Sequence, residues 1–403
     1  MPPAKGGGME MIMNIIFLDW PCFCREDTVS ALSALGHSVS FFFHPEYDSR
    51  RSAVFDAAFD EFCSSGNYDL VFSYNFYPLV SEGCKRRGLK YIAIVYDAPH
   101  VSLYSYTIVY PCNYIFLFDY TQYQELAGMG ITTVHYFPLA GNTDRIRMLL
   151  AREHNPERYT ADVSFVGSLY NEDHNFFDRL TGLSDYAKGY LDAIMEAQLK
   201  VYGYYFIEEL LTKDILYEMK SSVPYHANYT GIQTDEYIYG NYFIGRKLTE
   251  KDRLRTLTAA AAVHPLRLYT LNSSYHAPGI ENMGTVDYHN EMPYVFHYSK
   301  INLNITLKSI KSGIPLRAVD IMSAGGFLLT NYQADLLRHF TPDEDFVYYN
   351  DLDDLTHKIQ YYLEHDEERR RIAQNGQNKI RCHHSFKQHF EEIFRIILNG
   401  DSN

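Results

Sequence analysis

The stretch KSGIPLRAVDIMSAGGFLLTN, residues 311–331, combines a turn, a short helix and a strand with side chains that suit an anionic ligand. Pro315 suits the first helical position, because it needs no amide partner there and brings a suitable φ. The unpaired amides and the positive dipole end of such a helix favour an anion. Arg317 suits a phosphate, and the Asp320 carboxylate can accept from two ribose hydroxyls. The stretch therefore predicts a site for a nucleoside diphosphate.

Neighbouring residues extend this predicted site. Gly313 would let a ligand approach the backbone, and offsets of four and three residues place it on one helical face with Arg317 and Asp320. Lys308 and Lys311 precede the turn, where positive charge would neutralise a diphosphate. A surface helix with an Arg317–Asp320 ion pair and a glycine C-cap is the simpler alternative. The residues alone leave both interpretations open.

The preceding stretch, GTVDYHNEMPYVFHYSKINLNIT (residues 284–306), favours the ligand site. A glycine turn and a polar link lead into a helix with inward apolar residues, and a buried strand then runs directly to Lys308. His276 and Tyr288 border the predicted cleft and are candidates for contact with a sugar or a base.

These residues must be positioned by an α/β fold. Apolar runs such as MNIIFLDW (13–20), YDLVFSYN (68–75) and KYIAIVYDAP (90–99) alternate with helical patterns, which predicts a doubly wound parallel sheet. Ligands bind beyond the carboxyl ends of such strands, so Asp97 and Asp19 are expected at that edge. A second series begins with the strand in ADVSFVGSLYNEDH (161–174).

The predicted organisation has two Rossmann-like domains facing a cleft. Residues 1–12 are expected to be a leader or tag, 13–145 the N-terminal domain and 146–380 the C-terminal domain, with a polar hinge over 138–148. Residues 381–403 should form a helix that returns to the first domain. Residues 175–262 are too long for an ordinary connection and predict a helical insertion. Extra core is its simplest role, and acceptor binding or a dimer contact are the alternatives.

Composition narrows the functional class. The net charge of −14, without a long basic block, argues against a nucleic-acid partner. No apolar run approaches the roughly 18 residues of a transmembrane helix, so a cytoplasmic protein is expected. The acidic run DLDD (351–354) opens an amphipathic helix, as is typical of a cap, and we therefore expect no essential metal and no cofactor.

The two stretches quoted first, together with FVYYNDLDDLTHKIQYYLEHDEERRRIAQNGQNKI (346–380), resemble the nucleotide-binding half of GT-B glycosyltransferases. The nearest likeness is to the group described as spore-maturation (CgeB-like) proteins. Residues 65–160 resemble the N-terminal domain that accompanies this half in many bacterial members. The resemblance implies a hexosyltransferase-type enzyme that uses a nucleotide-diphosphate sugar, with a UDP sugar as the expected donor, and an acceptor that the sequence does not specify.

The resemblance also implies roles for particular residues. Asp320 matches the acidic residue that binds the donor ribose, although that residue is a longer glutamate in the family pattern. Its upstream acidic partner would fall near Ser312 and is missing, which leaves a retaining mechanism without support. The expected donor contacts are Gly167, Ser168, His276, Gly284, Thr285, Val286, Tyr288, Lys308, Lys311, Gly313, Ile314, Pro315, Leu316, Arg317 and Asp320.

Catalysis by an inverting enzyme needs a base for the acceptor's proton, expected on the cleft side of the first domain. Asp97 and His100 in YDAPH are the candidates, with Asp19 in reserve. The simpler role of Asp97 is a turn former before Pro99. Two other functions remain as alternatives: a sugar-nucleotide epimerase or hydrolase of the same fold, and a non-catalytic protein that binds a nucleotide sugar.

Overall fold

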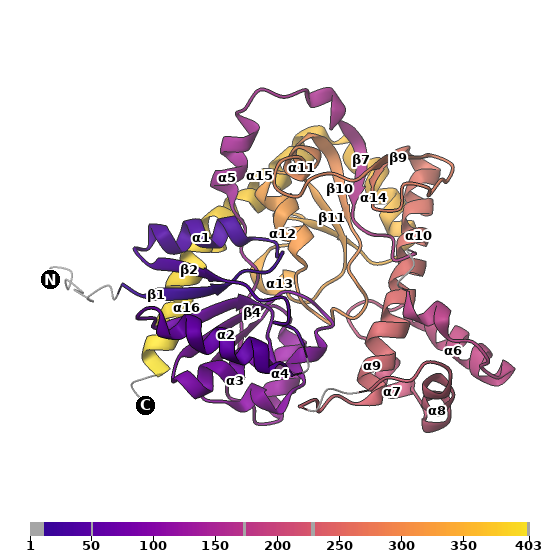
Figure 1. Cartoon of the computed structure of the whole chain (residues 1–403). Helices are drawn as coiled ribbons and strands as arrows, with labels where there is room; N and C mark the ends of the chain where they lie inside the picture. Colours follow the sequence, from indigo (N-terminus) through magenta and orange to yellow (C-terminus); the bar gives the residue numbers. More distant parts are fainter. Residues whose placement is uncertain (1–11, 50, 172–174, 227–229, 401–403) are drawn as a thin grey trace, which may run out of the picture.

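The computed structural model describes residues 12–49, 51–171, 175–226 and 230–400, so residues 1–11 of the predicted leader lie outside it. Two six-stranded sheets, parallel in every pairing, form the centres of two α/β domains that lie side by side (Figure 1). Among the described residues, none of the helices has the length and apolar character that a bilayer span requires.

The first sheet has the strand order β2-β1-β3-β4-β5-β6. Helices cover both of its faces, so its inner strands are runs of buried residues; β3 is buried along its whole length. Its strands are Asn14–Leu18 (β1), Ser38–Phe42 (β2), Leu70–Tyr74 (β3), Lys90–Val95 (β4), Asn113–Leu117 (β5) and Val134–Tyr136 (β6). Its helices are Arg25–Ala34 (α1), Ala53–Ser64 (α2), Pro78–Arg87 (α3) and Tyr120–Gly128 (α4), with 3₁₀ turns at Val101–Leu103 (η1) and Tyr106–Val109 (η2).

The second sheet has the order β12-β11-β10-β7-β8-β9. The chain adds β8 and β9 on one side of β7 and then β10, β11 and β12 on its other side, so the strand order has a switch point between β7 and β10. Ligands of doubly wound sheets bind at such a switch point, beyond the carboxyl ends of the strands. Its strands are Ala161–Val166 (β7), Leu266–Tyr269 (β8), Ile280–Gly284 (β9), Ser299–Asn304 (β10), Leu328–Asn331 (β11) and Val347–Tyr349 (β12). Its helices include Met292–Tyr298 (α11), Leu316–Ser323 (α12), Leu336–His339 (α13), Leu352–Glu364 (α14) and Asp366–His383 (α15). Asp351 caps α14 by accepting from the amide of Asp354 at 2.8 Å, as the sequence indicated.

A helical segment lies between β7 and β8 and has a hydrophobic core of its own, which includes Leu191, Met219 and Ile244. It comprises a short turn at Phe176–Arg179 (η4), Asp185–Gln198 (α6), Ile207–Leu210 (α7), Lys213–Ser222 (α8), Asp235–Ile238 (α9), the π-helix Tyr239–Gly245 (η5) and Arg246–Val263 (α10). The turn Pro156–Arg158 (η3) precedes β7. The segment also reaches the first domain, where Ile232 N donates to Tyr104 O at 2.8 Å beside an antiparallel bridge between Ser105 and Gly231.

Two helices carry the chain between the domains. The predicted hinge over 138–148 is wrong in part, because Thr143–Leu150 forms α5, whose Ile146 and Leu149 are buried in the core of the second domain. The last helix, Phe386–Gly400 (α16), lies beside α1 in Figure 1 and buries Phe390 and Ile393 in the core of the first domain. The helices α5 and α16 and the helical insertion therefore each help to join the two domains.

Candidate functional site

A cavity of about 490 Å³ lies between the domains at the switch point of the second sheet. The first domain contributes the segment 96–100, which follows β4. The second domain contributes residues after β10 and the start of α12, and the insertion contributes α10. The cavity brings together five residues that the sequence predicted to share a site: Asp97, His100, Pro315, Leu316 and Arg317.

Arg317 reaches across this cavity from α12. Its Nη1 donates to Asn304 Oδ1 at 3.1 Å, and its guanidinium lies 5.0 Å from the centre of the Phe165 ring. It also passes close to the backbone after β7, since a Cβ built on Gly167 would come within 2.4 Å of Arg317 Nη2. Gly167 has a φ of +151°. Glycine is required here because it adopts this backbone conformation without strain and leaves room for the Arg317 side chain.

A second arginine, Arg253, lies beside Arg317. It donates to Ile305 O at 2.9 Å and also bonds Ser168 O, so it fixes the loops after β10 and β7. Burial, together with the positive charge of Arg253, lowers the pKa of Arg317 to about 9. Within the described residues Arg317 makes no ion pair with a carboxylate. The guanidinium groups of Arg253 and Arg317 therefore lie close together in a region shielded from solvent.

Arg246 completes a group of three arginines around the cavity. Its Nε is buried and has no hydrogen-bond partner among the described residues. A buried donor without a partner costs free energy, which a bound acceptor would restore. The three guanidiniums and the first-turn amides of α12 could together hold a multiply charged anion, such as a diphosphate.

The start of α12 differs from the prediction. The helix begins at Leu316, so Pro315 is its N-cap and Gly313 lies outside the helical face of Arg317 and Asp320. A Cβ on Gly313 would lie 2.8 Å from the Phe118 ring, so this glycine allows the first domain to pack rather than a ligand to approach. Ile314 is also buried. The prediction that Gly313 faces a ligand is therefore wrong.

The loop before α12 is held by the first domain. Asp119, the N-cap of α4, accepts from the amides of Lys311 and Ser312 at 2.7 and 3.1 Å. In return, Asp335 of the second domain accepts from the amide of Tyr120 at 2.9 Å. These buried carboxylates fix the orientation of the two domains where the α12 turn meets the cavity.

Neither predicted lysine faces the cavity. Lys308 Nζ lies 3.1 Å from a carboxylate oxygen of Asp252, and both side chains are more than 90% buried. Lys311 Nζ pairs with Glu125 at 2.8 Å and Glu208 at 3.3 Å, on the other side of the loop. The predicted donor role of both lysines is wrong, because carboxylates of the insertion and of α4 already neutralise them.

Asp320 is covered in this structure by Tyr288, whose hydroxyl donates to Asp320 Oδ1 at 3.3 Å. Tyr288 in turn packs against Phe23 of the first domain, with 4.7 Å between the ring centres and an angle of 49° between the ring planes. Burial raises the pKa of Asp320 to about 7, although Tyr288 and Arg145 oppose the shift. The sequence placed Asp320 and Tyr288 in one site, and the structure brings them into contact.

Asp97 is exposed at the cavity, and Asn75 orients it by donating Nδ2 to Asp97 Oδ2 at 2.7 Å. His100 lines the same cavity. Burial lowers the pKa of His100. Its Nε2 lies against the backbone of Phe76, 3.2 Å from the amide nitrogen and 2.8 Å from the carbonyl oxygen, and its role as a base stays a prediction.

The other predicted residues lie around this site or outside it. Gly167 and Ser168 form the loop that Arg253 and Arg317 contact. Gly284 ends the edge strand β9, Thr285 and Val286 follow it, and His276 is exposed in the β8–β9 loop; the lining of the cavity includes none of these four. The reserve base Asp19 is occupied by an ion pair with Arg25 at 2.5 Å.

Comparison with known proteins bears on this arrangement. Residues 246–395 match the model of a family described as glycosyl transferase-like. The structure of a glycosyltransferase from Rickettsia africae aligns with a TM-score of 0.52 at 11% identity, over 97% of this chain and 99% of the other. The fold is GT-B. No curated protein sequence matches the chain.

Two further GT-B neighbours are similar over nearly the whole chain. Sucrose-phosphate synthase from Thermosynechococcus elongatus has a TM-score of 0.52 and 10% identity, over 96% of this chain and 99% of the other. An α-glucosyltransferase in complex with UDP and a 13-mer DNA has a TM-score of 0.52 and 11% identity, over 96% and 100%. The closer resemblance to the spore-maturation group stays a prediction.

Sequence reasoning missed Arg246 and Arg253. Both lie in the stretch GRKLTEKDRLRTLTAAAAV, whose helical pattern assigned it to the insertion. Arg253 is almost fully buried, at 3% exposure, in a helix otherwise rich in charged residues. A single sequence does not show which arginine of a charged helix points inward.

Replacing Arg317 by alanine tests the charge arrangement without a ligand. Since its guanidinium lies beside Arg253 and has no carboxylate partner, Arg317→Ala should leave the free energy of unfolding unchanged or raise it by about 1 kcal/mol. Urea unfolding measures this, with the surface variant Arg147→Ala as the control. A loss of more than about 2 kcal/mol would show that Arg317 is a structural residue.

A second prediction concerns the pH dependence of stability through Asp320. The pKa of Asp320 is about 7 in the folded protein and about 3.9 in the unfolded chain. Between these two pH values the folded state binds more protons than the unfolded state, so the free energy of unfolding rises as the pH falls. Asp320→Asn should therefore raise the melting temperature more at pH 8 than at pH 5. A constant difference between these pH values would contradict the raised pKa.

Proposed function

We propose that the chain is a glycosyltransferase that takes a sugar from a nucleotide-diphosphate donor, with UDP as the nucleotide, and needs no metal. The observation that carries the proposal is the group Arg246, Arg253 and Arg317 around a cavity at the switch point of the second sheet. A departing nucleoside diphosphate gains negative charge in the transition state, and fixed guanidiniums and helix amides stabilise that charge. Arginines in this arrangement take the place that a divalent cation has in other transferases.

The nucleoside would extend from the arginines towards Asp320. The Tyr288 hydroxyl, which donates to Asp320 in this structure, occupies the place of a ribose hydroxyl. Binding of the donor then requires Tyr288 to turn away, so that the ribose hydroxyls donate to the Asp320 carboxylate instead. The segment from Gly284 to Tyr288 is the nearest candidate for contact with the base.

Asp97 is the candidate base on the opposite side of the cavity. Its carboxylate is exposed and is oriented by Asn75, so it can accept the proton of an acceptor hydroxyl. An inverting transfer would form the bond from that oxygen to the sugar carbon as the bond to the diphosphate breaks. The proton moves to Asp97, and the arginines hold the leaving UDP.

The comparisons support the proposal at the level of fold and family. The family model covers the arginine-bearing helix α10 and α12, and one neighbour with this fold was solved with UDP. Transfer of a hexose and a bacterial, cytoplasmic setting are further parts of the proposal. An epimerase or hydrolase would use the same donor site without an acceptor, and a binding protein would show no turnover.

Binding of UDP is the first test. Arg317→Ala should weaken UDP binding by about 1–3 kcal/mol, or roughly 5- to 150-fold, because a charge-assisted contact to the diphosphate is lost. Isothermal titration without added metal measures the affinity, with Arg147→Ala as the matched surface control. Equal UDP affinity of wild type and Arg317→Ala would reject the proposed site. A thermal-shift comparison of UDP with GDP, CDP and dTDP tests the identity of the nucleotide, and a larger shift with one of the other three would replace UDP.

The role of Asp97 is tested separately. Asp97→Asn should bind UDP within about twofold of wild type and release UDP from its sugar donor at least about 100-fold more slowly, because the base is lost while the donor contacts remain. The assay follows UDP release from a panel of UDP sugars with mixed acceptors. Undiminished release by Asp97→Asn would remove it as the base, and release that needs no acceptor would favour the hydrolase.

A further inference from the structure

A second cavity, of about 410 Å³, lies on the other side of the loop that carries Lys311. Three parts of the chain meet there: η1, η2 and α4 of the first domain, the insertion with α7 and α9, and Lys311 of the second domain. Its volume is within the range of small-molecule sites, about 300–1,000 Å³. The cavity shares no lining residue with the arginine cavity.

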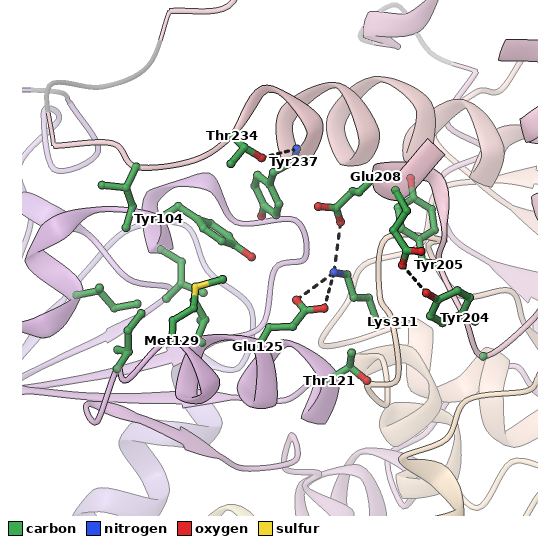
Figure 2. Close-up of a pocket in the computed structure, with 17 residues that line it drawn as sticks. Tyr104, Thr121, Glu125, Met129, Tyr204, Tyr205, Glu208, Thr234, Tyr237 and Lys311 are labelled. Carbon is green, nitrogen blue, oxygen red and sulfur yellow. Dashed lines mark hydrogen bonds and ion pairs between the residues drawn. The ribbon is translucent and has the colours of Figure 1, made fainter. Parts of the chain in front are cut away.

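The cavity has two chemically different halves (Figure 2). In the left half of the view lie the Tyr104 ring, Met129 and side chains that consist only of carbon. The lining of the cavity includes the apolar residues Leu103, Ile108, Leu126 and Ile131. In the right half lie Glu125, Glu208, Lys311 and the hydroxyls of Tyr204 and Thr121. One part of an occupant would therefore be apolar and the other part polar.

The polar half offers both donors and acceptors of hydrogen bonds. Lys311 Nζ lies between Glu125, at 2.8 and 3.0 Å, and Glu208, at 3.3 Å. Glu209 bonds the hydroxyl of Tyr204 at the same end. Three carboxylates against one ammonium disfavour an anionic occupant, whereas hydroxyl groups, which donate and accept, match the mixed set.

The mouth of the cavity is apolar and open to solvent. Met129 is 71% exposed and Ile232 is 57% exposed, although both belong to its lining. Within the same wall, Tyr237 is 6% exposed and its ring lies 4.1 Å from that of Tyr104. An interface that only joined the insertion to the first domain would close over such side chains.

We propose that this cavity binds a neutral amphiphile, a molecule with an apolar ring or chain joined to a hydroxylated head such as a sugar. The apolar part packs against the first-domain side, between Leu126 and Tyr104, and the head reaches Glu125, Glu208 and Lys311. The site is separate from the arginine cavity, and it does not depend on the proposed transfer reaction.

Phenyl β-glucoside is the probe, because its phenyl ring and neutral sugar match the two halves. Its matched comparison is phenyl β-glucuronide, which differs by a carboxylate in place of the hydroxymethyl group. Saturable binding of the glucoside is expected by ligand-observed NMR titration of the full chain, and the glucuronide should bind at least about tenfold more weakly, because its carboxylate would face the three glutamates.

Variants place the probe in this cavity. Ile232→Trp and, independently, Met129→Trp should each weaken glucoside binding at least about tenfold by narrowing the mouth, and both positions are exposed enough to accept the larger ring. Val54→Trp, at a 64% exposed position on α2, is the matched control and should bind normally, as should Arg317→Ala in the donor cavity. UDP affinity should not change in either mouth variant.

Three results would overturn the proposal. These are absence of saturable glucoside binding, equal affinity for the glucuronide, or an affinity that both mouth variants leave unchanged. Loss of UDP binding with retained glucoside binding would instead remove the proposed function and leave this site in place.

Discussion

The electrostatic constraint at the centre of this molecule is the placement of Arg253 and Arg317 side by side, with no ion pair between Arg317 and a carboxylate in the described part of the chain. Folding removes both guanidiniums from bulk water, so hydrogen bonds to backbone carbonyls and to Asn304 must compensate for the lost hydration. Such an arrangement is costly for a protein with nothing to bind. Under the proposed function, the diphosphate of the donor would supply the missing negative charge.

The same site depends on both domains and on the insertion. Asp119 and Asp335 exchange hydrogen bonds with amides across the domain boundary, which fixes the turn before α12. Arg253 comes from α10, the helix that joins the insertion to the second sheet, so the insertion also positions an anion-binding residue. The bridge between Ser105 and Gly231 then ties that insertion to the first domain. Movement of one part would change the geometry that the others hold.

Lysines and arginines near the site have different roles because their partners differ. Lys308 and Lys311 are each matched by carboxylates, so their charge contributes to folding and to the contacts between parts of the chain. Arg253 and Arg317 donate to the backbone carbonyl of Ile305 and to the side-chain amide of Asn304, and among the described residues Arg317 makes no ion pair with a carboxylate. Basic residues that are paired with carboxylates and basic residues that line the cavity occur within the same short stretches of sequence. Only the contacts in the folded structure distinguish the two groups.

By itself the sequence determined the two α/β domains, the helical insertion, and a site that joins Arg317 to Asp97, because hydrophobic periodicity and the exits of parallel strands are local properties. The tertiary structure decided which charges remain without a carboxylate, since Glu125, Glu208 and Asp252 reach the lysines from distant parts of the chain. It also decided that Gly313 faces Phe118 and that Arg253 faces inward. Pairing and burial of side chains depend on contacts between residues remote in sequence, which no local pattern contains.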